Sequence, residues 1–159
     1  MSLDSDIALL KRIPLFADLP TEQMRLLAFS AVRLDLAQDQ VLFREGTKAS
    51  SGFVVSSGGL QLTVGEGQKK KVVANCEIGS LIGELALLIE TTRPSTATAM
   101  VSSQVLELDR KLIIRMLNEY PHIALRLRAT LSERLMATMT ELGRVRAALA
   151  DIDRRRARR

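Results

Sequence analysis

The chain is poor in the residues that catalytic and metal sites use most. Its 159 residues include one cysteine and one histidine. Cys76 has no second cysteine with which to form an internal disulfide, so nothing indicates an oxidising compartment. His122 alone cannot supply a cluster of metal ligands or complete a Ser-His-Asp or Cys-His set. We therefore expect no catalytic activity, no metal and no cofactor.

Long apolar runs are absent as well. No stretch of about 18 apolar residues occurs, so we expect no membrane span. The first six residues are acidic and lack the basic start and apolar stretch of a signal peptide. Together with the lone cysteine, these absences predict a cytoplasmic protein. The hydrophobic content of 47% is enough for a folded core, and the length fits one domain with an appended helix.

The positive charge is concentrated towards the C-terminal end. Residues 1–119 carry 13 basic and 14 acidic side chains, whereas residues 120–159 carry 10 basic and 4 acidic ones. The arginine-rich tail, residues 154–159, could meet nucleic acid or an acidic partner. A solvated helix end whose arginines complement the helix dipole is the simpler interpretation. We prefer it because no base-reading element accompanies the tail.

The chain opens with a helical pattern. Ile7, Leu10 and Ile13 recur at helical spacing, and Pro14 then ends this first helix. The pattern predicts an N-terminal helical segment over residues 1–30.

Residues 31–109 show short strands separated by turn residues. Apolar and polar side chains alternate over residues 60–64, which is the period of a strand with one solvated face. Residues 96–101 and 104–109 look like a further strand pair. Seven or eight such strands within about 80 residues predict a small antiparallel β-roll or jelly-roll barrel. With helices before and after it, the expected fold class is α+β, mainly β.

Helical periodicity returns over residues 110–159. A short helix is followed by Tyr120 and Pro121, where a last helix of 30 residues or more begins. The apolar seam of this helix repeats at intervals of four and three residues, with one polar member: Leu131, Leu135, Thr138, Leu142, Val145, Leu149 and Ile152. This heptad seam favours a coiled coil with a second copy, hence a homodimer, over packing on the chain's own β-roll.

The most informative motif runs from Gly83 to Leu88 and is followed by Arg93. The glycine lets a ligand approach the backbone, and the apolar residues after Glu84 can form one helical turn whose N–H groups attract an anion. The Glu84 carboxylate is suited to accept a hydrogen bond from a sugar hydroxyl, and Arg93 can clamp phosphate oxygens. A buried turn and a solvated arginine would be the plain alternative. Gly79 before the motif, and the small and polar strand residues after it, strengthen the ligand-site interpretation.

The stretch GELALLIETTRPSTATA resembles the phosphate-binding cassette of cyclic nucleotide-binding domains. These domains occur in catabolite-activator-type transcription regulators, in cyclic-nucleotide-dependent kinases and in gated ion channels. The cassette here covers residues 79–99, and the resemblance extends over residues 7–142. Other landmarks of the family also match: Ile13-Pro14-Leu15-Phe16, Leu42-Phe43-Arg44-Glu45-Gly46 and Phe53-Val54-Val55-Ser56-Ser57-Gly58. The chain is most similar to the small bacterial members that consist of this domain alone.

The resemblance implies roles for individual cassette residues. Glu84 would accept a hydrogen bond from the ribose 2′-hydroxyl, and Arg93 would hold the cyclic phosphate. Backbone N–H groups near Gly83, Leu85 and Ala86 would complete the phosphate cradle.

The resemblance also implies a base pocket. The strand around Val73, Ala74 and Cys76 would line it, with Cys76 as a small apolar wall rather than a nucleophile. The last helix would act as a dimerisation and lid helix. Thr138 falls where a polar seam residue reaches adenine in catabolite-activator-like regulators, or it is only a small residue tolerated in a coiled coil. Arg134 could pair with Glu84 or approach the sugar.

One departure from the family pattern is Pro94, where Ala, Ser or Thr usually follows the cassette arginine. Proline has no N–H, so one phosphate hydrogen bond is missing, at a cost of about 1 kcal/mol in affinity. Pro94 also lacks the hydroxyl that can favour guanine, and strand alternation could turn Ser95 away from the ligand. We therefore expect cAMP to be favoured over cGMP.

Four functions were compared. A sensor that binds cyclic nucleotide, shifts its last helix and acts on an unknown protein partner fits best. A DNA-binding regulator would need a winged helix-turn-helix after the long helix, and only nine residues follow, although the arginine tail could still contact nucleic acid. A cupin-type enzyme would need more histidines. A degenerate domain that has lost its ligand is favoured only by Pro94.

Overall fold

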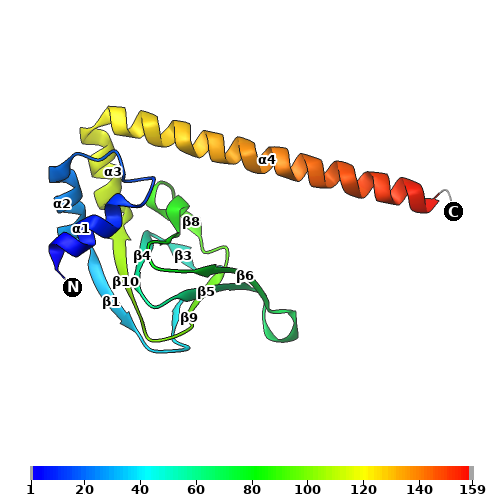
Figure 1. The fold of residues 1–159 in the computed structure, drawn as a ribbon, viewed down its shortest axis with the longest axis horizontal. Helices are drawn as coiled ribbons and strands as arrows, with labels where there is room; N and C mark the ends of the chain where they lie inside the picture. The colour runs from blue at the N-terminus through cyan, green and yellow to red at the C-terminus, as the bar shows by residue number, and fades with distance from the viewer. Residues whose placement is uncertain (1, 158–159) are drawn as a thin grey trace. The chain divides into compact units, whose positions relative to one another are not determined.

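The computed structural model describes residues 2–157, without the side chains of six residues of the last helix (127, 130, 131, 134, 135 and 138). The chain forms two compact units, residues 1–119 and residues 120–159, which are described separately. The first unit begins with two helices, α1 (Leu3–Lys11) and α2 (Thr21–Ser30), and ends with α3 (Arg110–Glu119). Between α2 and α3 the chain is mostly β-structure (Figure 1).

The strands form two four-stranded antiparallel sheets and one short pair. Their orders are β1-β10-β4-β7, β2-β9-β5-β6 and β3-β8. Two short 3₁₀ turns, η1 (Gly67–Lys69) and η2 (Glu84–Leu87), interrupt the strands. The strand bounds are β1 (Val32–Leu36), β2 (Val41–Phe43), β3 (Lys48–Ala49), β4 (Ser51–Ser57), β5 (Leu60–Val64), β6 (Lys71–Cys76), β7 (Leu81–Ile82), β8 (Thr91–Thr92), β9 (Thr96–Ala99) and β10 (Ser103–Asp109).

The predicted fold class is confirmed, since antiparallel strands arranged as a roll lie between helices. One detail of the prediction is wrong: β9 and β10 are not partners. β9 pairs with β2 and β5, whereas β10 pairs with β1 and β4. Residues 100–102 carry the chain from one sheet to the other, and the Met100 N–H donates to the Gly59 carbonyl oxygen at 3.0 Å. The sequence located both strands, but their pairing depends on distant segments and leaves no local signal.

Strand β4 separates two apolar cores. Phe53 and Val55 point into the roll, where they pack with residues such as Leu60 and Val105. Val54, between them, faces the other way and packs with the helices. This is the period of two that a strand imposes on its side chains. Because both faces of β4 are covered, residues 51–56 are all buried.

The helical core of the first unit joins the helices to the back of this sheet. Its fully buried members come from several elements: Leu10, Met24, Leu27, Val54, Leu87, Leu106 and Leu108. Leu87 lies in η2, so the central motif of the sequence is anchored among the helices by an apolar side chain.

The second unit is one helix, α4 (Pro121–Ala157), of 37 residues. It confirms the expected length, and Pro121 occupies its first turn, where a missing N–H costs nothing. Apolar side chains stand exposed along its second half, among them Leu142, Val145 and Leu149. None of the helices in the described part of the chain has both the length and the hydropathy that a bilayer crossing requires.

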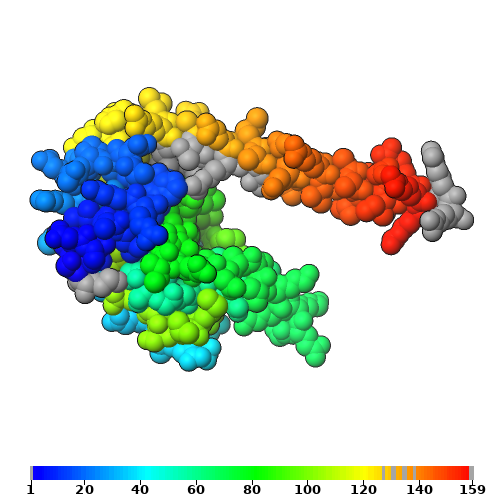
Figure 2. Space-filling view, viewed as in Figure 1, coloured from blue at the N-terminus to red at the C-terminus, as the bar shows by residue number. Residues whose placement is uncertain are grey.

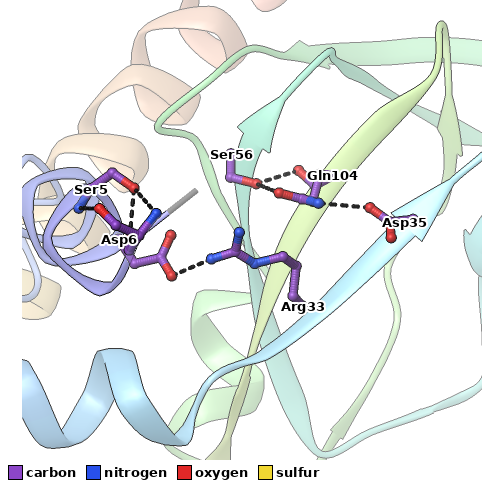
Figure 3. Close-up of polar contacts among 7 residues, drawn as sticks. Ser5, Asp6, Arg33, Asp35, Ser56 and Gln104 are labelled. Carbon is purple, nitrogen blue, oxygen red and sulfur yellow. Dashed lines mark hydrogen bonds and ion pairs between the residues drawn. The ribbon is translucent and has the colours of Figure 1, made fainter.

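An ion pair fastens the N-terminal helix to the sheet. Arg33 of β1 donates to Asp6 Oδ2 of α1, and Asp6 is only 5% exposed (Figure 3). In the same view, the side-chain amide of Gln104 on β10 donates to Asp35 at 2.7 Å. The backbone carbonyl oxygen of Gln104 accepts from the Ser56 hydroxyl at 3.0 Å. Asp6 Oδ1 is buried and has no hydrogen-bond partner among the described residues, so the carboxylate depends on Arg33.

Asp6→Asn should lower the free energy of unfolding by about 1–2 kcal/mol, because it removes a charged hydrogen bond while keeping the shape of the side chain. Urea unfolding of the purified variant measures this loss. Asp4→Asn is the matched control, since it removes the same charge from an exposed position in the first turn of α1. Equal losses in the two variants would contradict a stabilising role for the ion pair.

Candidate functional site

The cassette begins with a backbone turn that requires glycine. Gly83 has φ 78°, ψ 35°, which is the left-handed region, and it caps the single 3₁₀ turn η2. The Ala86 N–H donates to the Gly83 carbonyl oxygen at 3.1 Å. This N–H is therefore engaged within the turn, whereas the sequence had suggested it for the phosphate cradle. The expected single helical turn is present, as 3₁₀ rather than α.

Arg93 follows β8 and points its side chain into the roll. Its N–H donates to the Thr47 carbonyl oxygen and its own carbonyl accepts from the Gly46 N–H, both at 2.8 Å. The residue is only 5% exposed. These two bonds fix the backbone at the point where the guanidinium enters the interior.

Two aromatic rings flank the guanidinium. Its central carbon lies 4.4 Å from the ring centroid of Phe43 and 5.2 Å from that of Phe53. The two rings are themselves stacked, with centroids 5.8 Å apart. Ring faces carry negative potential and attract a cation, so they offset part of the cost of burying it.

The polar neighbours of Arg93 are unevenly distributed. Arg93 Nη2 donates to Ser51 Oγ at 3.4 Å, and Ser51 Oγ donates in turn to Glu107 Oε1 at 2.8 Å. Arg93 Nη1 is buried without a hydrogen-bond partner among the described residues. Burial lowers the pKa of Arg93 from its usual value, and the negative charge of Glu107 opposes that effect. The guanidinium thus has one occupied side and one available donor.

Gly83 lies directly against the available donor. A Cβ atom built on Gly83 would stand 2.5 Å from Arg93 Nη1, closer than real contacts allow. Glycine therefore suits this position in two ways, because it adopts the left-handed conformation without strain and leaves free the space beside the arginine.

The cassette encloses a cavity of about 260 Å³. Residues of η2, β8 and the segments next to them line it: Ala49, Gly83, Glu84, Leu85, Ala86, Thr91, Thr92, Arg93 and Pro94. Arg93, the half-buried carboxylate of Glu84 and a short turn therefore line one small space. This combination suits a ligand that carries both an anion and a hydroxyl group.

Arg110 links this cavity to the start of α3. Its Nη1 donates to the Ile89 carbonyl oxygen at 2.9 Å and lies 3.4 Å from the Ala49 carbonyl oxygen. Its backbone N–H donates to Ser50 at 3.0 Å. The end of the cassette turn and the beginning of the helix are consequently held by one side chain.

Five of the sequence-predicted residues line the cavity together: Gly83, Glu84, Leu85, Ala86 and Arg93. Ser95 does not line it. Ser95 is buried, as Arg93 is, while the intervening Pro94 is exposed.

The predicted base-pocket residues differ from one another in burial. Val73 and Ala74 are exposed on β6, the edge strand of its sheet. Cys76 is buried in the roll, where burial raises the pKa of its thiol, so it packs as a small apolar residue. The side chains of Arg134 and Thr138 lie outside the described residues.

Sequence reasoning missed the groups that hold the arginine. Phe43 and Phe53 were noted as family landmarks but not as neighbours of the guanidinium. Ser51 and Glu107 were not singled out at all, because they come together only through the pairing of β4 with β10. Nothing within the cassette itself points to them.

Comparison with known proteins identifies the family of the chain. The family model of the cyclic nucleotide-binding domain matches residues 33–120. The chain belongs to the cyclic nucleotide-binding domain family. The match begins at the second residue of β1 and includes the nine later strands and the whole cassette.

Solved structures share the fold of this cyclic nucleotide-binding domain. A cyclic nucleotide-binding-like protein from Brucella abortus is 35% identical, with a TM-score of 0.67 over 72% of this chain and 99% of that one. The N-terminal domain of a transcriptional regulator from Streptomyces coelicolor is 31% identical, with a TM-score of 0.75 over 84% of this chain and 94% of that one.

A longer relative also contains a similar domain. The lysophospholipase nte1 of Neurospora crassa is 31% identical over 109 residues, which is 67% of this chain. The chain spans 7% of the length of that relative.

The described residues bring no three His, Cys, Asp or Glu side chains together as a metal site would require.

Gly83→Ala should destabilise the domain by about 1 kcal/mol more than Gly46→Ala, as measured by urea unfolding. Both glycines have positive φ, 78° and 81°, so both variants bear the backbone strain of alanine in the left-handed region. Only at Gly83 does the new methyl group meet Arg93, because nothing lies within 4 Å of the corresponding position at Gly46. Equal destabilisation would show that the arginine moves aside without cost.

Proposed function

We propose that this domain binds a cyclic nucleotide, cAMP in preference to cGMP, and acts as a regulatory module. The observation that carries the proposal is the buried Arg93, whose Nη1 lies beside Gly83 and has no acceptor in the part of the chain that the structure describes. A buried donor without a partner is costly, and the oxygen of a bound phosphate would satisfy it.

The sugar end of the ligand would be held by Glu84. This carboxylate is half-buried and lines the same cavity as Arg93. A carboxylate accepts a hydrogen bond well and would repel a phosphate placed beside it, so it fits a neutral ribose hydroxyl. The preference for cAMP is supported by Pro94, which lines the cavity and has no hydroxyl to offer guanine.

Transmission of binding would pass through Arg110. A phosphate drawn towards Arg93 would move the η2 turn, and the carbonyl oxygen of Ile89 just after it accepts from Arg110. A shift there would displace the beginning of α3. The last residue of α3 lies two positions before the long helix in the chain. Ligand binding would then change the population of helix positions that a partner protein recognises.

Calorimetric titration should give binding of cAMP that is tighter than that of cGMP. Arg93→Met keeps the length and the apolar fit of the side chain, and it should weaken cAMP binding about 30- to 100-fold by removing a charged donor. Lys69→Met is the matched control: it removes the same charge from an exposed turn and should leave the affinity unchanged. Absence of heat with both nucleotides would contradict the proposal.

A homodimer through α4 is the second part of the proposal. The exposed apolar residues Leu142, Val145, Leu149 and Ile152 keep the heptad spacing and cannot all stay solvated at low cost. In a parallel pair with these residues at the seam, Glu141 would stand opposite Arg146 of the partner subunit. Opposite charges at these flanking positions favour a parallel pairing in register.

Sedimentation velocity should show a dimer, and the double substitution Leu142→Lys with Leu149→Lys should give a monomer, because four charges would meet at the seam. Replacing exposed positions on the face opposite the seam, Thr140→Lys with Ala147→Lys, adds the same number of charges, provides the control and should leave the dimer intact. A wild-type protein that sediments only as a monomer at micromolar concentration would exclude the coiled coil.

A further inference from the structure

Two hydrogen bonds connect Arg93 Nη2, through Ser51, to the carboxylate of Glu107. Ser51 of β4 accepts from Arg93 Nη2 and donates to Glu107 of β10, at 3.4 and 2.8 Å. The two strands are antiparallel partners over this stretch, with Phe53 opposite Glu107 and Ser51 opposite Asp109. The sheet pairing therefore fixes the distance between the carboxylate and the guanidinium.

The charge of Glu107 has a clear effect on the free arginine. Burial in the roll disfavours the charged guanidinium, and the rings of Phe43 and Phe53 offset this only in part. The negative charge of Glu107 favours the cationic form, in the direction opposite to burial. Glu107 is thus a resident counter-charge in the ligand-free protein.

The same charge acts on a ligand in the opposite sense. An anion that binds to Arg93 Nη1 shares the guanidinium with this carboxylate, which Ser51 connects to Nη2, and is repelled by it. A ligand that takes both Nη atoms must also displace the Ser51 hydroxyl. We propose that Glu107 is a positioning residue that stabilises Arg93 when the cavity is empty and lowers the affinity of the cavity for a cyclic phosphodiester monoanion. This inference rests on the proposed cyclic nucleotide site.

The inference makes two predictions of opposite sign for Glu107→Gln. The ligand-free protein becomes less stable, because the buried cation loses its counter-charge. The affinity for the anion rises, because a like charge is removed. A residue with only a structural role would lower both quantities when replaced.

Stability without ligand is measured first, by thermal unfolding of four proteins: wild type, Glu107→Gln, Arg93→Met and the double variant. Glu107→Gln should lower the midpoint by about 3 °C or more in the wild-type background. In the Arg93→Met background its effect should largely vanish, because no cation remains to be stabilised. Equal shifts in the two backgrounds overturn the inference.

Affinity is measured by calorimetric titration with cAMP. Glu107→Gln should bind about threefold or more tightly than wild type. Glu66→Gln is the matched control, since it removes the same charge from an exposed position outside the cassette, and it should change the affinity by less than about twofold. Unchanged or weaker binding by Glu107→Gln overturns the inference.

Failure of the proposed function gives a different result. If wild type binds neither cAMP nor cGMP, the proposed function fails in the wild-type protein. Glu107→Gln then decides the inference by itself. Gain of cAMP binding together with the coupling to Arg93 supports it, and absence of either overturns it.

Discussion

The first unit depends on keeping one guanidinium cation inside a β-roll. Burying such a group without partners would cost more than a domain of this size can spare. Arg93 remains there because Phe43 and Phe53 flank it and because Ser51 connects it to Glu107. These neighbours come from β2, in one four-stranded sheet, and from β4 and β10, in the other. The two sheets must therefore be correctly packed together before the arginine has a stable position.

The alternation along β4 makes this site sensitive to the helices. Phe53 faces the arginine, and its neighbour Val54 faces the helical core. The cassette is tied to the same core by Leu87, which has no exposed surface. Arg110 adds a polar link from the cassette to α3. A displacement at the cavity would thus reach the helical layer through packed side chains and hydrogen bonds, since close-packed interiors do not absorb displacements locally.

Much of this arrangement is available from the sequence, because its signals are local. The glycine and carboxylate of the cassette, the arginine that follows and the helical turn between them lie within 11 residues, and the structure gathers them around one cavity. Periodicity likewise located the long helix and the strand over residues 60–64. The two-residue strands β3, β7 and β8 are too short to show a period. The partners of β9 and β10 lie in distant segments of the chain and in different sheets, so the local sequence does not reveal them. Ser51 and Glu107 escaped for the same reason, since 56 residues separate them.

The position of Arg93 also changes the meaning of the clamp expected from sequence. A bidentate grip on phosphate needs two N–H groups directed at the ligand. Here Nη2 is engaged by Ser51, and Nη1 has no acceptor among the residues that the structure describes. A phosphate that takes both groups must break the Arg93–Ser51 bond, and Pro94 offers no backbone N–H in return. Both features reduce the free energy gained on binding, and neither alters the fold. In such a pocket, the residues that hold the arginine in the empty state would therefore reduce the affinity that the arginine supplies.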